Sequence, residues 1–308
     1  MRRASAVALV GPTASGKSAL AHSLARDLEA SILCVDAMTV YRGMDLGTAK
    51  PTAAQRLEVD YRLIDLVEPS EEFTVAQYQV AAREAANDVA ESGRPVLYVG
   101  GTGLYGRAVL DELEIPGRYR EVRSALEERA TDDLAALYAE LAELDPVAAQ
   151  RMEPTNARRV VRALEVTLGS GRPFSSFGEG LLTYGAVRVV QVGLRSDLAE
   201  LDRRIEKRFR AWMDEGLLAE VERLRTAPGG LGRSARQAVG YRELLRHVEQ
   251  GADLEACVVD AITQSRRLAR RQRSWFSRDP RIEWFDDVPD AAARLADVLN
   301  GPDGFVRD

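Results

Sequence analysis

The first residues with recognisable chemistry form a phosphate-binding loop. The run Gly11-Pro12-Thr13-Ala14-Ser15-Gly16-Lys17-Ser18 has the glycine, lysine and hydroxyl spacing of such loops. Glycines let backbone N–H groups converge on phosphate oxygens, and the N-terminus of the following helix adds partial positive charge. Lys17 would contact a phosphate, and the Ser18 hydroxyl would bind Mg²⁺. The loop therefore predicts binding of a di- or triphosphate, such as that of ATP, and does not by itself predict hydrolysis.

Two further polar groups follow predicted strand ends. Asp36 comes after one apolar run, and Thr102 lies in Gly100-Gly101-Thr102-Gly103 after another. Ligands of open α/β sheets bind outside the carboxyl ends of the strands. We therefore expect a carboxylate base and a hydroxyl donor to converge on the phosphate loop. Taken alone, Asp36 is equally well interpreted as a helix cap or a ligand of Mg²⁺-bound water, and glycine turns after strands are common.

The elements around these residues predict a parallel sheet. Apolar runs indicate strands at 6–10, 31–35, 62–67, 95–99, 187–194 and 281–284. Capping and periodicity indicate helices at 17–28, 74–92, 197–214, 216–225, 235–250 and 253–278, followed by a terminal helix. This alternation predicts an α/β protein with a P-loop NTPase-like parallel sheet flanked by helices.

The pattern changes in the middle of the chain. Residues 120–168 are charged and helical without a strand-like run, and 169–185 are rich in Gly, Ser and Phe, which indicates a loop. We therefore predict an all-helical insertion domain over residues 114–188. The α/β core would consist of residues 1–113 and 189–308.

Composition narrows the class of protein. The chain has 308 residues, of which 45% are hydrophobic, and no apolar run approaches the roughly 20 residues of a membrane span. Cys34 and Cys257 fit no metal spacing and imply no disulfide framework, so we expect a cytoplasmic protein without a membrane partner. The net charge of −6 argues mildly against a nucleic-acid partner. However, only three of the 42 basic residues are lysines, and the clustered arginines suit phosphate recognition.

Several segments together resemble the tRNA dimethylallyltransferases. The stretch Val35–Pro51 (VDAMTVYRGMDLGTAKP) is the most specific of them. Further segments similar to that family span nearly the whole chain: Gly11–Ser18, Gly100–Tyr105, Arg158–Glu165, Arg204–Val221, Gln237–Arg242 and Arg266–Arg278.

The resemblance implies a reaction and roles for residues. Asp36 would be the general base for the exocyclic amine of an adenine, the phosphate loop would hold dimethylallyl diphosphate with Mg²⁺, and Thr102 would contact the leaving diphosphate. Thr102 and Arg123 would line the reaction channel. Arg204 and Arg208 could flank the diphosphate or pair with neighbouring carboxylates. The residues implied to contact tRNA are Asp36, Ala37, Met38, Thr39, Arg158, Arg159, Val160, Val161, Arg162, Gln237, Gly240, Tyr241 and Arg242.

The same resemblance defines the acceptor. The prenyl group would go to N6 of the adenosine immediately 3′ of the anticodon, in tRNAs that read codons beginning with U. The helical insertion would grip the anticodon stem-loop, and the target base would be flipped into the channel of a monomeric enzyme. The physical requirements agree, because a stacked base must be extruded before its amine reacts and a leaving diphosphate needs cations.

The sequence departs from the family pattern at a few positions. Ala37 and Thr39 stand where serine and glutamine are frequent, which affects fine recognition of tRNA more than the chemistry. The run Asp60-Tyr61-Arg62 replaces a frequent histidine pair, and there is no Cys/His set for a C-terminal zinc finger.

Three other functions are compatible with parts of the sequence. A transferase acting on a free adenine nucleotide would lack much of the basic stretch over 120–172. A kinase or ATPase would place a second carboxylate after a strand, whereas the strand at 95–99 is followed by Gly-Gly-Thr. A non-catalytic tRNA-binding module would not need Asp36 in its intact motif.

Overall fold

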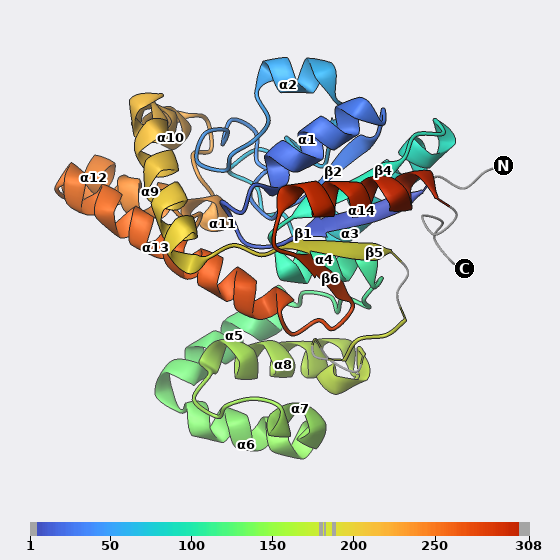
Figure 1. Cartoon of the computed structure of the whole chain (residues 1–308). Helices are drawn as coiled ribbons and strands as arrows, with labels where there is room; N and C mark the ends of the chain where they lie inside the picture. The colour runs from blue at the N-terminus through green and yellow to red at the C-terminus, as the bar shows by residue number, and fades with distance from the viewer. Residues whose placement is uncertain (1–4, 179–180, 182, 187–188, 302–308) are drawn as a thin grey trace. The chain divides into compact units, whose positions relative to one another are not determined.

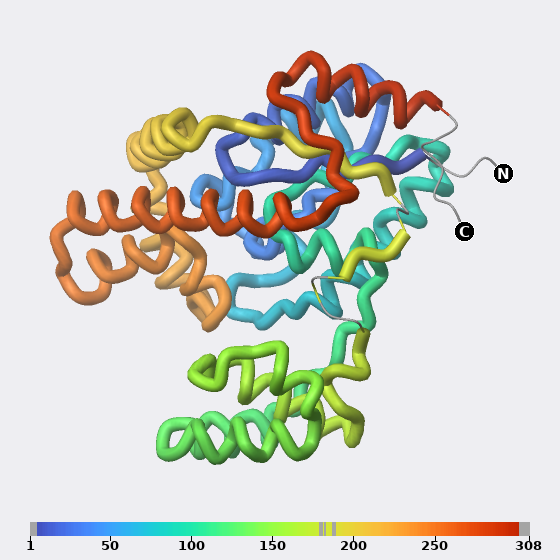
Figure 2. The backbone as a smooth tube through the Cα atoms, turned by 60° about the horizontal axis from the view of Figure 1, so that its bottom comes forward, coloured from blue at the N-terminus to red at the C-terminus, as the bar shows by residue number. Residues whose placement is uncertain are grey.

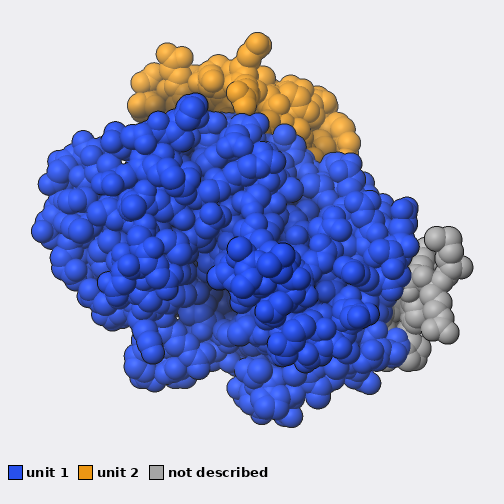
Figure 3. All heavy atoms as spheres, turned by 90° about the horizontal axis from the view of Figure 1, so that it is seen from above, with its two compact units in different colours: residues 1–112, 185–308 blue, residues 113–184 orange. Residues whose placement is uncertain are grey.

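A computed structural model describes residues 5–178, 181, 183–186 and 189–301. The chain divides into two compact units, which Figure 3 colours separately. The first contains Met1–Glu112 and Gly185–Asp308, and the second contains Leu113–Tyr184. The bounds of the predicted insertion, 114–188, are similar to those of the second unit. The last two residues of the predicted insertion lie outside the described ranges.

The first unit is built on a six-stranded sheet whose recorded strand pairs are all parallel (Figure 1). The strand order is β3-β2-β4-β1-β5-β6. The strands are β1 (Ala6–Val10), β2 (Ser31–Val35), β3 (Tyr61–Arg62), β4 (Val96–Gly100), β5 (Val190–Leu194) and β6 (Ile282–Phe285). The central strand β1 is buried along its whole length, as an apolar run in a doubly covered parallel sheet must be. The predicted fold class is confirmed.

Helices cover both faces of this sheet. Successive side chains of a strand point to opposite faces, so the wholly apolar β1 presents apolar side chains on both faces, and both must be covered. On one face, Val7 and Leu9 belong to a core with α1 and α14. On the other, Ala8 and Val10 share a core with Tyr78 of α3. The helices of this unit are α1 (Lys17–Asp27), α2 (Ala53–Glu58), α3 (Val75–Glu91), α4 (Gly103–Leu110), α9 (Leu198–Asp214), α10 (Leu217–Thr226), α11 (Arg233–Arg236), α12 (Tyr241–Gln250), α13 (Leu254–Phe276) and α14 (Val288–Asn300).

Two predicted elements were wrong in extent. The strand expected over 62–67 is reduced to β3, because Leu63 and Asp65 have φ values of 65° and 55° and turn the chain out of the sheet. The helix expected over 235–250 is interrupted at Gly240, whose φ is 96°, and becomes α11 and α12. The beginning of the strand predicted at 187 lies outside the described residues.

The second unit is helical, as predicted (Figure 2). It contains α5 (Arg120–Asp132), α6 (Leu134–Leu144), α7 (Pro146–Gln150), α8 (Ala157–Ser170) and the 3₁₀ turn Phe174–Ser176. Three helices start at side-chain caps, namely Asp133, Asp145 and Asn156, which satisfy otherwise unpaired N–H groups. Its own hydrophobic core is formed by α5, α6, α7 and α8.

None of the helices in the described ranges combines the length and hydropathy that a membrane span requires.

Candidate active site

The phosphate loop joins β1 to α1 through an unusual backbone. Gly11, Ala14 and Gly16 have φ values of 142°, 65° and 94°, conformations that favour glycine. The amine of Lys17, the first residue of α1, donates to the Pro12 carbonyl at 2.5 Å. The next residue, Ser18, is exposed and lines the same pocket, which suits its predicted contact with a phosphate-bound cation.

A second cation closes this loop from α9. The Arg208 guanidinium donates to the Thr13 hydroxyl at 2.8 Å and lies 4.7 Å from the ring centre of Trp212. Its Nε is buried and has no hydrogen-bond partner in the structure. Burial lowers the pKa of Arg208 to about 10. Burial, followed by repulsion from Arg208, lowers the pKa of Lys17 to about 7, whereas Asp36 opposes this shift. The buried Lys17 and the partly buried Arg208 thus face one pocket, and a bound anion would neutralise their charge.

Asp36 lies just beyond the end of β2. One of its carboxylate oxygens accepts from the Met38 N–H at 2.7 Å, and the other accepts from the Thr102 hydroxyl at 3.2 Å. The Thr102 hydroxyl in turn accepts from the Ala37 N–H at 3.3 Å. Burial raises the pKa of Asp36, although these hydrogen bonds and the charge of Lys17 oppose the increase. The carboxylate is therefore oriented and more basic than usual.

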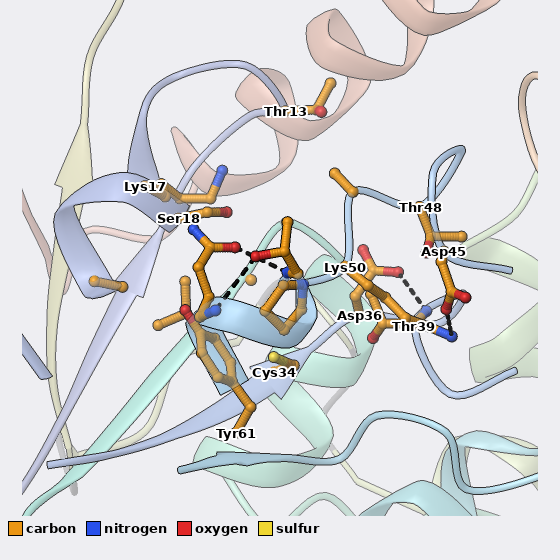
Figure 4. Close-up of a pocket in the computed structure, with 18 of the residues that line it drawn as sticks. Thr13, Lys17, Ser18, Cys34, Asp36, Thr39, Asp45, Thr48, Lys50 and Tyr61 are labelled. Carbon is orange, nitrogen blue, oxygen red and sulfur yellow. Dashed lines mark hydrogen bonds and ion pairs between the residues drawn. The ribbon is translucent and has the colours of Figure 1, made fainter. Parts of the chain in front are cut away.

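Lys17, Asp36 and Arg208 line one pocket of about 1060 Å³ in the first unit. Figure 4 shows Lys17 and Ser18 on one side of this pocket and Asp36 on the other. Arg204 also lines it, while paired with Glu200 at 2.8 Å. The structure thus brings together the phosphate loop, the predicted base and both predicted arginines of α9.

The loop that follows Asp36 is held by a buried carboxylate that we did not identify from the sequence. Glu220 of α10 accepts from the Tyr241 hydroxyl at 2.5 Å, and its second oxygen accepts from the N–H groups of Asp45 and Leu46 at 3.1 and 3.0 Å. A Cβ atom on Gly47 would lie 2.5 Å from the Tyr241 ring. This arrangement explains why glycine stands at position 47.

Lys50 anchors the other end of this loop. Its fully buried amine donates to the Asp65 carboxylate at 2.6 Å, to Asp45 at 3.0 Å and to the Tyr41 carbonyl at 2.6 Å. Arg56 binds the second oxygen of Asp65 at 2.6 Å. At Asp65, which contacts these two cations, the backbone departs from the expected strand conformation. Burial raises the pKa of Asp65, but the hydrogen bonds from Lys50 and Arg56 lower it by more.

The glycines around Thr102 serve packing within the protein. A Cβ on Gly100 would lie 1.9 Å from the Val35 carbonyl oxygen, one on Gly101 would lie 2.6 Å from Gln272, and one on Gly103 would lie 2.1 Å from Trp275. No local pattern of residues indicates a role for Gln272, which lies among arginines on α13.

Some residues predicted to contact tRNA are buried, and the prediction is corrected for their side chains. Val160 and Val161 belong to the core of the second unit. Tyr241 is fully buried beneath the loop described above, and Gly240 is buried beside it.

The roles predicted for the other residues of this group stay predictions. Arg158, Arg159, Gln237 and Arg242 are exposed, and Arg162 is partly exposed while bound to the Pro116 and Gly117 carbonyls. Ala37 and Met38 are partly exposed, whereas Thr39 is buried and its hydroxyl has no partner in the structure.

Arg123 belongs to the second unit. Its guanidinium pairs with Glu127 at 2.8 Å and with the buried Glu165 at 3.2 Å. Because it belongs to a different unit from Asp36 and Thr102, its predicted place in the same channel stays a prediction.

Fold and site together define a phosphate-loop α/β protein in which a carboxylate, Asp36, lines the same pocket as the cations Lys17 and Arg208. The model of the IPP transferase family matches residues 39–279. The tRNA dimethylallyltransferase of Bifidobacterium animalis subsp. lactis is 44% identical over 286 residues, covering 90% of this chain and 81% of the relative. That of Saccharopolyspora erythraea is 46% identical, with 91% and 90% covered. The chain therefore belongs to the IPP transferase family and is a transferase.

Solved structures agree with this assignment. The tRNA isopentenylpyrophosphate transferase of Bacillus halodurans is 34% identical, with a TM-score of 0.69 and 96% of each chain covered. A eukaryotic dimethylallyltransferase acting on tRNA has a TM-score of 0.77 at 22% identity, covering 96% of this chain and 78% of its own. The second comparison supports the fold alone.

Proposed function

We propose that this protein transfers the dimethylallyl group of dimethylallyl diphosphate to N6 of the adenosine immediately 3′ of the anticodon, in tRNAs that read codons beginning with U. The products are N6-isopentenyladenosine in tRNA and diphosphate. One observation carries the proposal: Asp36, bound to Thr102, faces the same pocket as Lys17 and Arg208. Membership in a family whose relatives are named for this transfer supports it.

The residues of this pocket suit each bond change. The adenine amine is a poor nucleophile because its lone pair is conjugated, and Asp36 takes its proton as the N6–carbon bond forms. The bond between the prenyl carbon and oxygen breaks, and the diphosphate leaves with the electron pair. Lys17 and Arg208 neutralise the charge that develops on it, and the Thr102 hydroxyl orients the base by donating to the Asp36 carboxylate.

Mg²⁺ fits this site as a partner of the diphosphate. Within the described ranges there is no group of three or more acidic, histidine or cysteine side chains that could hold a metal alone. Mg²⁺ is commonly bound by one or two protein groups together with substrate phosphates, and the exposed Ser18 hydroxyl in the phosphate loop provides one. When bound, the ion would supply further neutralisation of the leaving group.

The exposed arginines of α8 suit the anticodon stem-loop, because arginine binds phosphates bidentately and stacks on unpaired bases. Arg158, Arg159 and Arg162 lie on or near the surface of the second unit. Action on tRNA as a monomer in the cytoplasm is part of this proposal.

A transfer assay tests the proposal. Purified protein is mixed with labelled dimethylallyl diphosphate and Mg²⁺, without ATP, and with either unmodified tRNA or AMP as the acceptor. Label in tRNA alone, located next to the anticodon by nuclease mapping, is the expected result. Label in AMP would instead indicate a transferase for free nucleotides, and hydrolysis of added ATP without any label transfer would indicate an NTPase.

A further inference from the structure

Gln272 of α13 touches both loops that carry the reacting groups. Its side-chain oxygen accepts from the Thr13 N–H of the phosphate loop at 2.8 Å, although the two residues are 259 positions apart. Its amide nitrogen lies where a Cβ on Gly101 would be only 2.6 Å away. The Gln272 side chain also lines the pocket. One side chain therefore spans the gap between the loop after β1 and the loop after β4.

A second contact from the same helix face flanks Thr102 on its other side. Trp275 lies one turn beyond Gln272 and fills the space beside Gly103, where a Cβ would be 2.1 Å from the indole nitrogen. Neither Gly101 nor Gly103 has a positive φ in the structure. The Trp275 ring leaves no room for a side chain at position 103, and a Cβ at position 101 would displace the Gln272 amide. Thr102 therefore lies between two sites of contact with α13.

We propose that Gln272 is a positioning residue. It orients the Thr102 hydroxyl toward Asp36, and it fixes the position of the phosphate loop relative to the loop that carries Thr102. This rests on the function proposed above. Thr102 donates to Asp36 and accepts from Ala37, so a shift of the loop that carries Thr102 alters the orientation of the base. Misplacement by about 1 Å at a reacting centre costs up to about a hundredfold in rate.

Steady-state kinetics of Gln272→Leu test this role. The matched control is Gln264→Leu, since Gln264 is partly buried on the same helix and bonds Asp260 at 3.1 Å. We expect Gln272→Leu to lower kcat about tenfold or more with an unchanged KM for tRNA, and the control to stay within about twofold of the native protein. Equal kcat values for the two variants would overturn the proposal.

A double-mutant cycle separates positioning from a general structural effect. If Gln272 acts through Thr102, then Gln272→Leu should cost little more once Thr102→Val is present, because residues in one network are not additive. Losses that multiply fully would show that Gln272 acts independently of Thr102 and would overturn this part of the proposal.

Two further measurements keep the test decisive. If Gln272→Leu does not fold, Gly101→Ala is the alternative variant. Its added methyl group displaces the Gln272 amide from its contact with residue 101, so kcat should fall by a similar factor. Calorimetric binding of inorganic pyrophosphate with MgCl₂ needs no tRNA, and its Kd should rise at least about threefold in Gln272→Leu only, because Thr13 is no longer held. If the native protein prenylates no acceptor, the function fails, while the pyrophosphate result still decides whether Gln272 holds the loop.

Discussion

Two like charges lie at the phosphate loop, on the buried Lys17 and the partly buried Arg208. Neither cation has a carboxylate partner within salt-bridge distance in the described structure. The cost of burying them is visible in the lowered pKa of Lys17, about 7. A bound diphosphate would replace the missing partner and raise that pKa again. Donor binding should therefore be linked to protonation of a single amine.

The first prediction concerns this linkage. Above pH 7 the free protein carries a neutral Lys17, and binding must take up a proton, so affinity for dimethylallyl diphosphate should fall as pH rises through about 7. Calorimetry between pH 7 and 9, in buffers of different ionisation enthalpy, should detect an uptake that approaches one proton. Lys17→Met should bind weakly and show none of this dependence, and an unchanged pH profile in that variant would contradict the assignment.

Asp36 gives a second prediction at the same scale. Asp36→Asn keeps an acceptor for the Met38 N–H but removes the base, so kcat should fall by at least about a hundredfold while the Kd for tRNA stays nearly constant. Because burial raises the pKa of Asp36, the acid limb of the native kcat/KM profile should lie above the pH of about 3.9 that is usual for aspartate. A near-native rate in the variant would remove Asp36 as the base.

At the scale of elements, the active loops depend on helices that are distant in sequence. We could predict that the phosphate loop, Asp36 and Thr102 lie close together. Each follows an apolar strand, and the carboxyl ends of parallel strands meet at one edge of the sheet. The supports from α10, α12 and α13 were not predictable. Glu220 and Gln272 are single residues in charged helices, and only tertiary packing shows that they face inward. Likewise, the turn at Leu63 and Asp65 that shortens β3 could not be predicted, because no glycine or proline lies within three residues of either position.

The buried pair under the loop gives a prediction of stability. Tyr241→Phe leaves a Glu220 oxygen without its 2.5 Å hydrogen bond, and an unsatisfied buried acceptor costs about 1–3 kcal/mol. Chemical denaturation should show this loss in the free energy of unfolding. Tyr61→Phe is the control, since that partly exposed hydroxyl bonds His22 at 3.0 Å and its loss should be smaller. Equal effects would mean that Glu220 finds another donor.

At the scale of the whole molecule, the net charge of −6 is a poor guide to partners. Many arginines pair with carboxylates within each unit, as Arg270 does with Asp202 and Arg129 does with Glu140. The exposed arginines of α8 are distinguished by their position, which the total charge does not reveal. The fold class and the helical nature of the insertion followed from the sequence, whereas the burial of Val160 and Val161 inside a basic motif did not.

Salt dependence tests this view of the charge. If several phosphates are contacted, log Kd for tRNA should increase steeply with log salt concentration, with a slope of about 0.7–0.9 per phosphate. Arg158→Ala and Arg159→Ala together should reduce that slope, while pyrophosphate binding stays unchanged. A flat dependence in the native protein would exclude α8 as a phosphate-binding surface.

The discontinuity of the first unit also matters while the chain is being made. β1 is central in the sheet, with β4 on one side and β5 on the other, but β5 is synthesised only after the whole second unit. At roughly 5–20 residues per second, the stretch from Gly100 to Val190 takes about 5–18 s to translate. Throughout that interval the apolar edge of β1 lacks its partner and is open to pairing with other chains. The position of the insertion thus sets a period during translation in which the nascent sheet needs protection from aggregation.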